Sequence, residues 1–99
     1  MRIVVGERTW NLSFPKYIGG RRPGRPRGVY GSCSRPDRTP RKILVRADLR
    51  GKRLVDTLIH ELLHAGAWVL DEEVVEELAT DIARVLYHKD VQARINGEV

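Results

Sequence analysis

The spacing of apolar residues changes at Leu54, and this change divides the chain into a strand-like half and a helical half. Before Leu54, short segments alternate apolar and polar side chains or are rich in β-branched residues, and glycine or proline lies close to them. This pattern is typical of β-strands. We predict strands over residues 2–5, 9–14, 28–33 and 43–46, which would give a sheet of three or four strands.

After Leu54 the apolar residues recur every three or four positions, which predicts a helix with one apolar face that ends near Gly66. Asp71 is a suitable N-cap, and the acidic residues after it suit the first turn of a second helix. We expect this helix to run to about His88 and the polar tail from Asp90 to fray. Its predicted buried face consists of Val74, Val75, Leu78, Ala79, Ile82, Val85 and Leu86.

The predicted fold class is α+β, with a small sheet followed by two helices. The length of 99 residues corresponds to one domain. Within it, residues 1–53 form a strand- and loop-rich half and residues 54–88 form a two-helix half.

The charge of the chain is divided in the same way. Residues 1–53 hold 15 Lys and Arg against 3 Asp and Glu, whereas residues 54–99 hold 3 against 10. We expect the two halves to attract each other. The arginines of a loop rich in glycine and proline could also contact phosphates of nucleic acid without sequence specificity, although a solvated loop explains them as well. These arginines are Arg21, Arg22, Arg25 and Arg27.

The chain contains no apolar run of the roughly 20 residues that cross a membrane, and its first residues are too short for a signal-peptide core. Cys33 is the single cysteine, so no internal disulfide can form, which agrees with a reducing compartment. We therefore predict a cytoplasmic protein without a membrane segment.

The run His60-Glu61-Leu62-Leu63-His64 lies within the first predicted helix. Residues four apart project from the same side of a helix, so the two imidazoles can bind one Zn²⁺. Glu61 is about 100° around the helix from His60. From there it can hold a metal-bound water, take its proton and pass the proton to a leaving group.

A catalytic zinc commonly has three protein ligands, so this site needs one more. His88 is a poor candidate because it lies far along the second helix. A carboxylate from the start of that helix is better placed, and the candidates are Glu72, Glu73, Glu76 and Glu77.

The motif and the acidic helix after it resemble the gluzincins, the thermolysin-like clan of zincin metallopeptidases. By this resemblance, the Glu-x-x-x-Asp element at 77–81 makes Glu77 the third ligand and Asp81 the acceptor that orients a ligand histidine. The segment Glu76-Glu77-Leu78-Ala79 also resembles the Glu-x-x-Ala element of the ImmA/IrrE-type metallopeptidases, which would make Glu76 the ligand. We prefer Glu77 because it has an aspartate one turn further on.

In zincins, a strand before the metal-binding helix commonly lies at the edge of the cleft and pairs with the substrate. The resemblance therefore suggests that role for residues 43–46, although a core strand explains them equally. The larger gluzincins have a histidine or tyrosine that stabilises the oxyanion, and this chain has no evident counterpart. Possible substitutes are Tyr17, Tyr30, Arg46 and Tyr87.

The expected function is that of a zinc-dependent metallopeptidase, in which Glu61 activates water to attack a peptide carbonyl. The alternative is a zinc-containing binding module whose basic half binds nucleic acid or an acidic protein. A combination of protease and basic loop resembles the SprT-like proteins, which are associated with DNA. Glu61 favours the enzyme, because a binding module does not need a general base beside the metal.

Overall fold

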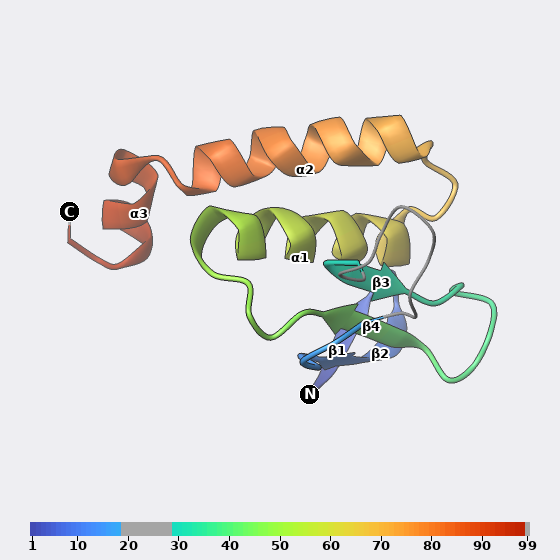
Figure 1. The fold of residues 1–99 in the computed structure, drawn as a ribbon. Helices are drawn as coiled ribbons and strands as arrows, with labels where there is room; N and C mark the ends of the chain where they lie inside the picture. The colour runs from blue at the N-terminus through green and yellow to red at the C-terminus, as the bar shows by residue number, and fades with distance from the viewer. Residues whose placement is uncertain (19–28, 99) are drawn as a thin grey trace.

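The computed structural model describes residues 1–18 and 29–98, and in these it contains four strands and three helices (Figure 1). The α+β fold class is confirmed, with a four-stranded sheet followed by helices. The elements are β1 (Arg2–Val5), β2 (Arg8–Ser13), β3 (Gly31–Cys33), β4 (Lys42–Val45), α1 (Gly51–Gly66), α2 (Glu72–Leu86) and α3 (Lys89–Ile95).

The sheet is mixed and has the order β1-β2-β4-β3. β1 and β2 form an antiparallel pair, β2 and β4 are parallel, and β4 pairs with β3 in the antiparallel sense. The strand predicted at 43–46 therefore has a neighbour on each side, and the prediction that it lies at the edge of a cleft is wrong. β3 is the edge strand beside it.

Helix α1 covers one face of the sheet, and α2 lies on the other side of α1, so the molecule has three layers with α1 in the middle (Figure 1). Leu54, Leu58 and Leu62 follow one another at one-turn intervals on α1 and pack against the buried core. That core consists of Trp10, Leu12, Ile43, Val45, Leu49 and Ala65. Burial of this stripe fixes which side of α1 faces the sheet.

Helix α2 buries a narrower face than its sequence pattern predicts. Its buried residues are Val75, Ala79 and Ala83, which are one turn apart. Four of the apolar residues predicted to be buried remain 38–60% exposed, namely Val74, Leu78, Ile82 and Val85. The difference arises because α2 packs mainly on one helix, α1, which covers only a narrow stripe of it.

The C-terminal tail forms the short helix α3 instead of fraying. The Nδ1 atom of His88 accepts a hydrogen bond from the backbone N–H of Asp90, 3.2 Å away, and so caps this helix. In the part of the chain that the structure describes, no helix is long and apolar enough to cross a membrane.

Candidate metal centre

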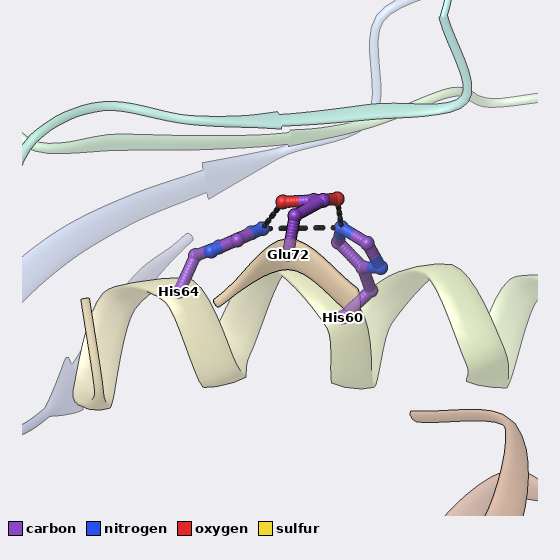
Figure 2. Close-up of side chains that lie close together, drawn as sticks. All are labelled: His60, His64 and Glu72. Carbon is purple, nitrogen blue, oxygen red and sulfur yellow. Dashed lines mark hydrogen bonds and ion pairs between the residues drawn. The ribbon is translucent and has the colours of Figure 1, made fainter. Parts of the chain in front are cut away.

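Two histidines of α1 and one glutamate of α2 converge on a single point (Figure 2). His60 Nε2 lies 2.9 Å from one carboxylate oxygen of Glu72, and His64 Nε2 lies 2.8 Å from the other. The two Nε2 atoms are 3.1 Å apart. The spacing of four residues therefore places the two imidazoles side by side, as the sequence predicts.

The connection between the helices explains why Glu72 reaches this point. Its backbone turns tightly: Ala67 N–H donates to Leu63 O at 2.7 Å and Leu70 N–H donates to Ala67 O at 3.0 Å. α2 then returns along α1, so that its first residue lies beside the second half of α1. Two turns further on, the Thr80 hydroxyl donates to Asp56 at 3.4 Å, in the same antiparallel register.

The structure does not bring Glu77, the preferred third ligand of the sequence prediction, to the histidines; the carboxylate that meets them is that of Glu72. Glu77 lies five residues after Glu72, which on a helix means about 7.5 Å further along the axis and about 140° around it. Asp81 does not orient a histidine either: its carboxylate accepts a hydrogen bond from Arg84 at 3.0 Å. Glu76, the alternative, lines the same cavity as the two histidines but is not part of the cluster.

Glu61 lies beside this cluster and is buried, with only 5% of its surface exposed. Its Oε1 atom is 3.9 Å from His60 Nε2. Its Oε2 atom is buried and has no hydrogen-bond partner among the described residues. Burial, and to a lesser extent the negative charge of Glu72, raises the pKa of Glu61 to about 7.

Strand β3 covers Glu61 because position 31 has no side chain. A Cβ atom at Gly31 would lie 2.9 Å from Glu61 Cγ and 2.9 Å from Thr57 Cγ2, which is closer than carbon atoms approach. The absence of that atom lets the strand pack directly on the glutamate. Cys33 lies two residues further along the same strand, and burial together with the charge of Glu61 raises the pKa of its thiol to about 12.

These groups line an open cavity of about 1120 Å³ between β3, α1 and α2. One face of α1 contributes Arg53, Thr57, His60, Glu61 and His64 to it. Trp68 lies at the end of the cavity that holds His64, with ring centroids 5.9 Å apart.

Of the four residues considered as substitutes for an oxyanion-stabilising group, only Tyr30 lines this cavity. Arg46 is paired with Asp48, with its Nε 2.6 Å from Oδ1. Tyr87 lies next to Gly51 at the start of α1, and Tyr17 is exposed outside the cavity. The arginines at 21, 22, 25 and 27 lie outside the described residues.

Sequence reasoning did not single out Gly31, Arg53 or Trp68. The sequence could have predicted that Arg53 lies near the site, because it precedes His60 by seven residues and is therefore on the same side of α1. It could not have predicted the importance of Gly31, which comes from the approach of a strand that is distant in sequence.

The three converging side chains fit a divalent metal ion. Tetrahedral zinc with bonds of about 2.0–2.1 Å keeps its ligand atoms about 3.3–3.4 Å apart. The two Nε2 atoms, 3.1 Å apart, are within a few tenths of an ångström of that value. The 2.9 and 2.8 Å contacts go to different oxygens of Glu72, and one ligand atom from each of the three residues lies within 4.8 Å of the others. The two nitrogens and one carboxylate are donors that zinc accepts, and the 58% exposure of the Glu72 side chain leaves the site open to a further ligand.

Comparison with known proteins gives no match to this chain, whether among family models, curated proteins or solved structures. The geometry of the described residues is therefore the basis for assigning a function.

Proposed function

We propose that this protein is a zinc-dependent peptidase with a zincin-like core, in which His60, His64 and Glu72 hold the metal and Glu61 is the general base. The observation that carries the proposal is the buried Glu61 carboxylate, which lies 3.9 Å from a nitrogen of His60 and has one oxygen without a partner in the described part of the chain. A purely structural metal site has no use for such a group, and burying an unsatisfied carboxylate destabilises the fold.

Glu61 is suited to moving a proton. A pKa of about 7 lets the carboxylate accept a proton from water near neutral pH and release it again to the amine of a leaving group. When bound, zinc lowers the pKa of water and polarises a carbonyl oxygen. Gly31 packs on the Glu61 side chain and holds it in place.

Strand β3 supports a peptide as the substrate. Arg46 N–H donates to Tyr30 O, and Ser34 N–H donates to Lys42 O, both at 2.9 Å. In this antiparallel register the backbone polar groups of Gly31 and Cys33 point away from β4, and no other described strand pairs with them. β3 also lines the cavity, so an extended peptide that pairs with it would pass the metal centre.

Two measurements test the proposal. Elemental analysis of the purified protein should give about one zinc per chain, and His60→Ala should remove it. Glu61→Gln should keep the zinc but lower the hydrolysis of a general peptide library by about 10²–10⁴-fold.

The matched control is Glu77→Gln, which makes the same chemical change on α2 outside the cluster and should leave zinc content and hydrolysis intact. A native protein without metal would refute the metal site. Equal hydrolysis by the wild type and Glu61→Gln would refute the role of Glu61.

A further inference from the structure

The cavity has a positively charged end that the proposed chemistry does not use. Lys52 and Arg53 line it at the start of α1, where the one carboxylate beside them, Asp56, accepts a hydrogen bond from Thr80. Glu61, Glu72 and Glu76 line it around the histidines. Arg53 precedes His60 by seven residues, or about two turns, so both side chains leave the helix in nearly the same direction. The cavity is therefore cationic at one end and carboxylate-rich at the other.

Tyr30 holds the Arg53 guanidinium in place. Arg53 Nη1 donates to the tyrosine hydroxyl at 2.9 Å, and the guanidinium carbon lies 5.2 Å from the ring centroid. These contacts use one of the five N–H donors of arginine and leave the others for a ligand. Among the described residues, no carboxylate forms an ion pair with Arg53, in contrast to Arg46, which is paired with Asp48.

The distance to the metal centre is suited to an extended peptide. Seven helical residues correspond to about 10.5 Å, and an extended chain advances about 3.3 Å per residue. Consider a peptide that pairs with β3 and has its scissile bond next to Glu61. A side chain or terminus about three residues from that bond would then lie within reach of Arg53.

We propose that Arg53, with Lys52, forms a subsite for a carboxylate of the substrate, about three residues from the bond that is cut. This inference rests on the proposed function and adds the substrate class to it, namely acidic peptides. The carboxylate belongs either to an aspartate or glutamate side chain or to the C-terminus of a short peptide. Arg53 is the better donor of the pair because its planar guanidinium can form two hydrogen bonds with one carboxylate.

Peptide binding to the zinc-loaded Glu61→Gln variant tests this subsite without requiring turnover. The probes are fluorescein-labelled nine-residue alanine–serine peptides with an amidated C-terminus, in which one glutamate or one glutamine is moved along the chain. When the substituted residue is at one particular position of the peptide, the glutamate peptide should bind about five- to tenfold more tightly than the glutamine peptide. A partly exposed charge-assisted hydrogen bond would give a difference of this size. A further arm compares the amidated glutamine peptides with free-acid peptides of decreasing length, to detect recognition of a C-terminal carboxylate.

Adding Arg53→Gln to this variant should remove the preference, whereas Arg8→Gln, the same change on an exposed arginine of β2, should preserve it. A preference for either source of carboxylate that disappears with Arg53→Gln supports the subsite. Equal binding of acidic and neutral probes in both arms overturns it, even if the wild type cleaves peptides. Selective binding in a protein that cleaves nothing would uphold the subsite and overturn the proposed peptidase.

Discussion

Glu61 differs from the other carboxylates of the chain in its surroundings. It lies under β3, with the negatively charged Glu72 nearby and with one oxygen that has no hydrogen-bond partner in the ranges 1–18 and 29–98. Both features disfavour the ionised form, which explains the direction of the pKa shift. A buried carboxylate that costs stability and is nevertheless placed beside the two histidines of the proposed metal site is typical of a functional site.

The raised pKa makes the stability of the metal-free protein depend on pH. In the unfolded chain this carboxyl titrates near 4.5, and in the folded protein near 7, so folding takes up a proton between these values. The contribution of Glu61 to stability is therefore most favourable below about pH 4.5 and declines as the pH rises toward 7. A shift of this size corresponds to about 2–4 kcal/mol.

Glu61→Gln should remove this loss of stability. Urea unfolding of the wild type and of Glu61→Gln in the presence of a chelator, between pH 4.5 and 8, measures the difference directly. The free energy of unfolding of the variant should increase relative to that of the wild type as the pH rises, and the difference between them should level off above pH 7. Other titrating groups are common to both proteins, so two parallel stability curves would show that Glu61 is not buried as described.

At the scale of secondary-structure elements, the approach of β3 to α1 determines the shape of the cavity. The closest point is Gly31, where an added Cβ would meet both Glu61 and Thr57 at 2.9 Å. β3 is only three residues long, and among the described strands it pairs with β4 alone, so its packing on α1 is its other main contact. The position in which β3 packs against α1 therefore depends on Gly31.

Gly31→Ala should destabilise the protein by about 1–3 kcal/mol, as overpacking of a filled site does. The control is Gly66→Ala, where the new Cβ meets only Val5 Cγ1, at 3.3 Å, and alanine has the higher helix propensity. Thermal or urea unfolding of both variants checks the expectation. A Gly31→Ala protein as stable as Gly66→Ala would mean that β3 does not pack on Glu61.

The sequence predicts elements better than it predicts their neighbours. Periodicity located the four strands and two main helices within a few residues, and the spacing of His60 and His64 placed both imidazoles correctly. It could not tell that β4 lies inside the sheet, because strand order depends on contacts between distant segments. It also could not select Glu72 from four neighbouring carboxylates, since the choice depends on how tightly residues 67–71 turn.

At the scale of the whole molecule, the structure gives no ion pair between the two unequally charged halves within residues 1–18 and 29–98. The ion pairs found among the described residues join partners within one half, such as Arg46 with Asp48 and the histidines with Glu72. Apolar packing of α1 on the sheet connects the halves instead. The charge difference is seen in the cavity, which has cations from one half at one end and carboxylates from the other half around the histidines.

The proposed metal ligands lie on two different helices, so metal binding should stabilise the whole fold. Zinc bound by His60 and His64 on α1 and by Glu72 on α2 would link helix α2 directly to helix α1. Free metal at 100 times its dissociation constant adds about 2.7 kcal/mol, which for a chain of this size raises Tm by about 10–20 °C.

Two variants distinguish the candidate third ligands. Glu72→Gln removes the carboxylate that the structure indicates, and Glu77→Gln removes the one that the sequence pattern suggested. If loss of the Glu72 carboxylate weakens binding a hundredfold, the same zinc concentration adds only about 0.4 kcal/mol, and the rise in Tm falls to a few degrees. Glu77→Gln should retain the full rise, because Glu77 is not part of the cluster. Thermal unfolding of the three proteins with and without zinc makes the comparison, and the opposite order of the two variants would mean that α2 returns along α1 in a different register from the one described.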